Sequence, residues 1–219
     1  QDNLLTICFD CLGTYPVEEV KWREERLALS KDITEETLRF APQGGIASYR
    51  YRPACQVCLN PGATDGMINV GVIGLPVRQE VLIQEGVAQQ YMNAITDGLA
   101  DEEMILKRVK MLERIIERHQ RTRAMMIAEL ENNLPGSIND LLEHLQECGG
   151  CHLCMEVCPI CTASTPRITD SNRLVREDVI TWLASCSGCG MCEQTCPKAL
   201  PLTAIFNRIR DQIVADHMA

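Results

Sequence analysis

The sequence predicts a chain of the α+β class, with a mixed N-terminal domain (1–100), a helical linker (101–147) and a helical C-terminal domain (148–219). Three observations predict this order. Short apolar stretches bounded by glycine and proline turns, as strands are, are confined to residues 1–100. An apolar pattern with a helical period follows over 101–131. Two closely similar cysteine repeats then lie among further helical patterns.

The N-terminal domain is expected to form a small sheet with helices beside it. A buried strand over residues 4–9 is predicted to end near Cys8 and Cys11, with further strands at 67–75 and 80–84. Helices are predicted over 18–29 and from Asp32 onward, and a turn at 42–45. A turn-rich loop over 51–62 carries Cys55 and Cys58.

The linker is predicted to be one long helix over 101–131. Its apolar residues keep to one stripe, formed by Ile105, Val109, Leu112, Ile116, Ile127 and Leu130. Acidic and basic residues balance along the helix, which favours a solvated bridging helix over a charged binding face. His119 falls on the stripe, and we interpret it as a packing or surface residue rather than a metal ligand.

The C-terminal domain is predicted to be helical. Ser137 is a suitable N-cap for a short helix that ends at Cys148, and a second helix is expected over 176–184. A C-terminal amphipathic helix is indicated by Leu202, Ile205, Phe206, Ile209 and Ile213. We expect the apolar faces of these helices to cover whatever the cysteines bind.

The two cysteine repeats, residues 148–159 and 186–197, each read C-x2-C-x2-C-x3-C-P. Bacterial-type ferredoxins use this spacing for 4Fe-4S clusters, and the fourth cysteine of each repeat binds the cluster of the other repeat. The proline after that cysteine turns the chain away from its own loop. The predicted ligand sets are a first site of Cys148, Cys151, Cys154 and Cys196, and a second site of Cys186, Cys189, Cys192 and Cys158.

Five cysteines lie outside these two sets. The N-terminal cysteines, Cys8, Cys11, Cys55 and Cys58, supply four thiolates, which suit either tetrahedral zinc or a 4Fe-4S cluster. Because residues 12–54 make a longer gap than a zinc ribbon has, we favour a third 4Fe-4S cluster. Cys161 is left as a packed thiol, although with Cys154 and Cys158 it matches the C-x3-C-x2-C motif of radical S-adenosylmethionine enzymes.

Composition narrows the class of protein. The sequence has thirteen cysteines, no secretory-signal pattern at its start and no apolar run as long as a membrane span. We therefore expect metal binding in a reducing, anaerobic cytoplasm, and no transmembrane segment. A net charge of −9 and 4% aromatic residues argue against nucleic acid as a partner. Since the first residue is Gln1 rather than Met, we expect a processed or truncated subunit.

Two stretches resemble a known family. Residues 52–58 followed by 64–74, with the upstream element 7–14, look like the β-subunit family of deazaflavin-coenzyme-dependent hydrogenases and formate dehydrogenases. Residues 196–202 resemble modules of formate dehydrogenase and heterodisulfide-reductase-type complexes. The resemblance covers residues 1–85 and 148–213, and implies a partial β-subunit-like domain followed by an α-helical ferredoxin-like domain. It also implies a flavin as a further cofactor, without assigning residues of this chain to it.

These observations predict an iron-sulfur electron-transfer subunit of a multi-subunit oxidoreductase. Its expected partners are a catalytic oxidoreductase subunit and further electron-transfer subunits. No general acid, nucleophile or phosphate loop stands out, so whether the chain is itself an enzyme stays open. One alternative is a flavin-containing subunit that itself oxidises or reduces a deazaflavin or nicotinamide coenzyme. Another is an assembly adaptor with structural zinc at the N-terminal cysteines.

Overall fold

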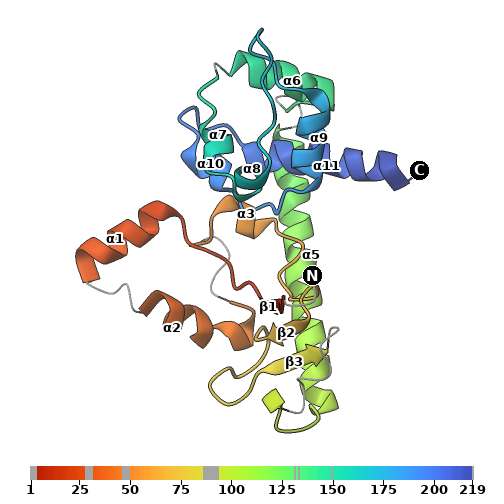
Figure 1. Ribbon diagram of the computed structural model, residues 1–219. Helices are drawn as coiled ribbons and strands as arrows, with labels where there is room; N and C mark the ends of the chain where they lie inside the picture. Colours follow the sequence, from red (N-terminus) through yellow and green to blue (C-terminus); the bar gives the residue numbers. More distant parts are fainter. Residues whose placement is uncertain are drawn as a thin grey trace. The chain divides into compact units, whose positions relative to one another are not determined.

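The structure, a computed structural model, describes residues 4–27, 32–45, 50–85, 94–130, 132, 134–148 and 150–218. Helices and one small sheet are present, which confirms the α+β class. The chain divides into two compact units, Gln1–Arg121 and Thr122–Ala219 (Figure 1). The division falls inside the long helix α5 (Glu102–Leu130), which contributes residues to both units.

The N-terminal unit contains a three-stranded sheet in the order β1-β2-β3. Strand β1 (Ile7–Phe9) runs parallel to β2 (Ile68–Gly71), and β2 is antiparallel to β3 (Leu82–Glu85). All three predicted strands are therefore present. The expectation that the first is buried is wrong, because β1 is an edge strand whose Ile7 and Phe9 side chains are 50% and 65% exposed.

Short helices α1, α2 and α3 and one 3-10 turn lie in the described part of the same unit. Helices α1 (Val17–Leu27) and α2 (Asp32–Arg39) confirm the two predicted helices, and residues 28 and 29 of the first prediction lie outside the described residues. The predicted turn at 42–45 contains η1 (Ala41–Gln43), which ends at Gly44 with a left-handed φ of 79°. Helix α3 (Pro53–Gln56) interrupts the predicted loop and begins with a proline at its first position.

Helix α5 confirms the predicted long helix, but part of its apolar stripe is exposed. On the expected stripe, Ile105 and Val109 are 40% and 44% exposed. The residues that are buried are Arg108, Ile115, His119 and Arg123. The rest of α5 is exposed or half-buried, and the two buried arginines have carboxylate partners within their own units, Asp10 for Arg108 and Asp211 for Arg123. A buried guanidinium is tolerated only with such a partner.

The C-terminal unit is built from short helices around the cysteine repeats. They are α6 (Ile138–Glu147), α7 (Leu153–Glu156), α8 (Pro159–Ala163), α9 (Arg176–Ala184), α10 (Met191–Thr195) and α11 (Leu202–Met218). The predicted cap is present, since the Ser137 hydroxyl accepts from the Asp140 N–H at 3.2 Å. Helix α6 ends at Cys148, and α9 has the bounds predicted for it.

The apolar face of α11 forms much of the core of this unit. Its five predicted core residues, Leu202, Ile205, Phe206, Ile209 and Ile213, are all buried. They pack with Leu141 of α6 and with Val179, Trp182 and Leu183 of α9. Full burial of one such side chain contributes about 1.5–3 kcal/mol. Among the helices in the described ranges, none combines the length and the apolar content that crossing a bilayer requires.

Candidate metal centres

The two cysteine repeats adopt the same local backbone. Gly150 and Gly188, at equivalent positions, have left-handed φ angles of 68° and 66°. Two residues later, His152 and Gly190 are also left-handed, at 55° and 72°. A short helix then begins in each repeat, and these helices, α7 and α10, pack against each other. His152 adopts at a cost of about 1–3 kcal/mol a conformation that glycine adopts freely, which indicates that the loop shape is needed.

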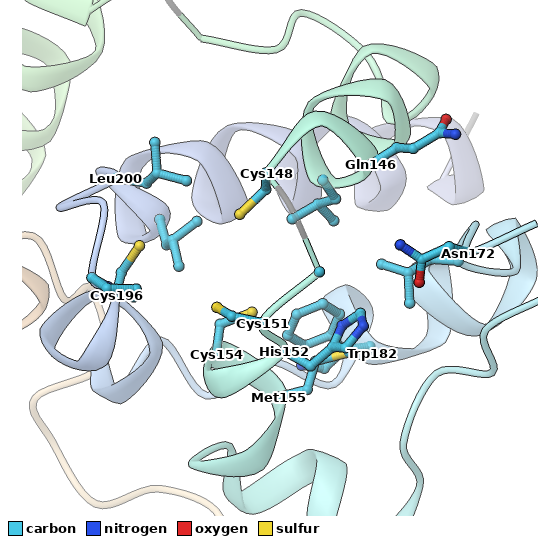
Figure 2. Close-up of a pocket in the computed structure, with 15 residues that line it drawn as sticks. Gln146, Cys148, Cys151, His152, Cys154, Met155, Asn172, Trp182, Cys196 and Leu200 are labelled. Atoms are coloured by element: carbon cyan, nitrogen blue, oxygen red, sulfur yellow. The ribbon is translucent and has the colours of Figure 1, made fainter.

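The first site lies on a pocket in the C-terminal unit. All four of its predicted ligands line this pocket, three from the first repeat and Cys196 from the second (Figure 2). Burial raises the pKa of Cys154 to about 11, and the neighbouring thiols of Cys148, Cys151 and Cys196 add to the rise. The rest of the lining is mostly apolar, including Leu145, Met155, Leu174 and Leu200. The fold thus brings the last cysteine of one repeat to the other three.

The cysteines of the second site also lie near one another. Burial raises the pKa of Cys192 to about 12, and the thiols of Cys186 and Cys189 contribute. Burial likewise raises the pKa of Cys186, where the thiol of Cys158 is one of the groups that interact with it. The fourth predicted ligand therefore approaches this site from the first repeat.

Cys158 differs from its neighbours because several donors reach its sulfur. Burial alone would raise its pKa, but hydrogen bonds from the backbone of Cys161 and Ile160 and from the indole of Trp182 outweigh burial and lower the pKa. The Trp182 Nε1–H donates to the Cys158 sulfur at 3.3 Å. The thiolate form that a metal requires is thus favoured at this residue.

Cys161 is a buried thiol beside the second site. It is 3% exposed and belongs to the apolar core. Burial raises its pKa to about 12, and the adjacent Cys158 raises it further. A thiol that stays protonated in the core is the packed residue that the sequence predicts.

The C-terminal cysteine sets are compatible with iron-sulfur binding. None of the thirteen cysteines forms a disulfide, and all of them lie within the described residues. Within those residues, no three histidine, cysteine or acidic side chains close on one point as ligands of a single ion do. A 4Fe-4S cubane instead spreads its four thiolates over four irons around a common space. The four cysteines of the first site line one pocket, which is compatible with such a cluster.

The N-terminal cysteines come from two adjoining segments. The Cys11 N–H donates to the Pro61 carbonyl at 2.8 Å, and the Arg52 N–H donates to the Thr14 carbonyl at 3.0 Å. These bonds place the loop after β1 against the loop that carries Cys55 and Cys58. Their thiols are not gathered around one point in the described structure. The four residues thus share a neighbourhood without a formed site.

Two polar residues position the loops of the N-terminal cysteines. Asp10, between Cys8 and Cys11, accepts hydrogen bonds from the Arg108 guanidinium and from the N–H groups of Ala63, Val72 and Ile73. His119, which is 6% exposed, lies with its Nδ1 at 2.7 Å from the Cys58 carbonyl. Burial lowers the pKa of His119 below 6.5, so the ring is neutral and donates. His119 is therefore a packing residue, as predicted, and also holds the Cys58 loop.

Sequence reasoning missed three residues near these sites: Trp182, Arg210 and Asp10. Trp182 lies in a predicted helix, and only folding brings its N–H to Cys158. Arg210 of α11 donates to the Cys186 carbonyl at 3.0 Å, although the residues are far apart in the sequence. The position of Asp10 between two candidate ligands was the one available signal.

No protein-family model matches the chain, and no curated protein matches it. The candidate sites therefore rest on the residues and on their geometry.

Proposed function

We propose that this chain is an iron-sulfur electron-transfer subunit of a cytoplasmic, multi-subunit oxidoreductase of the formate dehydrogenase, hydrogenase or heterodisulfide reductase type. It relays single electrons between a catalytic subunit and a flavin or another carrier. The first and second sites each hold a 4Fe-4S cluster, and the N-terminal cysteines hold a third.

One observation carries the proposal. Cys148, Cys151 and Cys154 share a pocket with Cys196, which lies in the other repeat (Figure 2). A ferredoxin-type pair of clusters needs this exchange of fourth ligands. Packing of α7 against α10 supports it, because this contact brings the two cysteine loops together.

The bound clusters would supply one-electron chemistry, with the added charge spread over irons, sulfides and thiolates. The residues of the chain do the rest. The cysteines hold the clusters, and the buried side chains of α9 and α11 keep water away from them. Because burial and hydrogen bonding around such groups set their potentials, this helical core matters for function as well as for stability.

The experiment separates relay from catalysis in the assembled complex. Cys189→Ser removes one ligand of the second site. We expect it to keep most activity of the catalytic subunit with an artificial dye and to lose most coupled activity between the natural partners, because the dye bypasses the relay. Both rates are measured on complexes shown by gel filtration to contain every subunit.

The matched control is Ser187→Ala, in the exposed loop between Cys186 and Gly188. It changes the same loop without removing a thiol and should leave both activities near wild type. If Cys189→Ser lowered the dye-linked and coupled activities together in an intact complex, the chain would take a direct part in substrate chemistry and the relay function would be rejected.

A further inference from the structure

The second site has a buried side-chain donor to one of its sulfurs. Trp182, in α9, is 3% exposed and donates its indole N–H to the Cys158 sulfur at 3.3 Å. Its ring meets Phe206 of α11 edge to face, with the ring centres 5.1 Å apart. Because the core holds the indole on both helices, this donor has a fixed direction.

The second site also has a cation beside it. The Arg210 guanidinium donates to the Cys186 carbonyl at 3.0 Å. At the same cysteine, the Gly188 N–H donates to the sulfur at 3.4 Å. Two of the four predicted ligands, Cys158 and Cys186, thus have a donor on their sulfur, and one of them has a positive charge close by.

The first site has a backbone donor at Cys154 but lacks the side-chain donor and the cation of the second site. Among the described residues that line its pocket there is no lysine or arginine. In the part of the chain that the structure describes, no side-chain N–H donates to the sulfurs of Cys148, Cys151, Cys154 or Cys196. Trp182 lines this pocket too, but its N–H is directed to Cys158. The two sites therefore differ in electrostatics although their loops are alike.

This difference has a chemical consequence if the clusters are present. Reduction adds one electron, and therefore one negative charge, that the thiolates share. N–H donors and cations next to the thiolates stabilise the reduced form more than the oxidised form, which raises the reduction potential. With clusters bound, a site with both groups would therefore have the higher reduction potential and would accept one electron, without a proton, from a site without them.

We propose that Trp182 and Arg210 make the second site the higher-potential of the two, so that an electron entering the pair comes to rest beside Cys158 and Cys186. The inference rests on the proposed cluster function and adds a direction to it. Trp182 and Arg210 are positioning residues, because they act through the ligands rather than by binding the clusters.

The test is a redox titration of the full-length chain, reconstituted anaerobically with iron and sulfide and followed by electron paramagnetic resonance. A Cys192→Ser variant assigns the signals, since only the first site keeps its four ligands among the two repeats. In the wild type we expect the second site to be reduced at the higher potential. In Trp182→Phe its potential falls, with an about two- to tenfold loss in electron occupancy relative to the first site.

Arg210→Gln should also lower the potential of the second site. If Trp182→Phe fails to retain iron, the Arg210→Gln variant alone tests the inference. The control is Arg208→Gln, which removes an equal charge from the same helix and should leave the potentials near wild type.

The inference is overturned if the first site has the higher potential in the wild type, or if neither variant lowers the second-site potential. This inference and the relay function can fail separately. If the potentials of the two sites differ as expected but Cys189→Ser keeps its coupled activity, only the relay function is rejected.

Discussion

Asp10 joins several loops of the N-terminal unit. Burial alone would raise its pKa, but the Arg108 guanidinium and three backbone N–H groups outweigh burial and hold the pKa below 3.8. The carboxylate and the guanidinium are 0% and 3% exposed. Since Asp10 lies between Cys8 and Cys11, the bonds that stabilise the unit also fix the loop of two candidate ligands.

Removing Arg108 should therefore destabilise this unit strongly. Arg108→Met leaves a buried carboxylate without its cation, and we expect the free energy of unfolding to fall by about 3–5 kcal/mol. Native-state hydrogen exchange of residues 66–75 reports on this unit alone. The pair stabilises the fold above pH 3.8, and this stabilisation is lost as the pH falls through the lower folded-state pKa of Asp10.

The matched control is Arg78→Met, because Arg78 and its partner Glu35 are 77% and 67% exposed. An exposed pair contributes at most about 1 kcal/mol. Equal effects of the two substitutions would show that Asp10 does not need its buried cation.

Among the elements, the helices α7 and α10 decide which cysteines meet. Each follows a left-handed residue, His152 or Gly190, and each carries the third cysteine of its repeat, Cys154 or Cys192. Their mutual packing brings the repeats side by side, so that a fourth ligand can come from the opposite repeat. The proposed crossed ligand sets therefore depend on this helix pair rather than on either loop.

If the two repeats exchange their fourth ligands, the loss of a fourth cysteine should damage the cluster bound by the other repeat. Cys196→Ser should impair the cluster of the first site more than that of the second, and Cys158→Ser should do the reverse. Electron paramagnetic resonance of the reduced chain measures both signals, with Cys151→Ser and Cys189→Ser as references for loss of each site.

Cys161→Ala is the control, because this buried thiol is not a predicted ligand and both signals should remain. If Cys158→Ser spared the second site and damaged the first, each repeat would bind its own cluster with four ligands, and the crossed sets would be wrong.

At the scale of the whole molecule, the metal content of the chain depends on what the N-terminal cysteines bind. If the N-terminal cysteines hold a third cluster, an anaerobically purified chain contains about twelve irons and no zinc. About eight irons and one zinc would instead support structural zinc at that position. Inductively coupled plasma mass spectrometry gives both numbers.

A Cys55→Ser, Cys58→Ser double variant tests whether the N-terminal cysteines bind the additional four irons. We expect it to lose about four irons and to keep about eight, because the C-terminal unit supplies its own eight ligands. Loss of all iron would mean that the units do not bind metal independently, and an unchanged content would remove the N-terminal cysteines from the metal-binding set.

Much of this protein could be predicted from short-range sequence features. The cap at Ser137, the bounds of α9 and the buried face of α11 follow from residue types a few positions apart. The three cysteines that each repeat supplies to a predicted set also follow from local spacing, because a tight loop can place three thiolates around one cluster only at fixed spacing, and their binding of clusters stays a prediction. These features depend on residues that are close in the sequence, so they do not require knowledge of the tertiary contacts.

Other features depend on partners that are distant in the sequence. The buried face of α5 contains Arg108 because Asp10 neutralises it, and no apolar period reveals that pairing. Strand β1 lies at the edge of the sheet with Ile7 and Phe9 exposed, which depends on what packs against it and not on its own apolar residues. Trp182 reaches Cys158 only when α9 and the first repeat share one core. Desolvation and hydrogen bonding act between neighbours in space, so these contacts were decided by the tertiary fold.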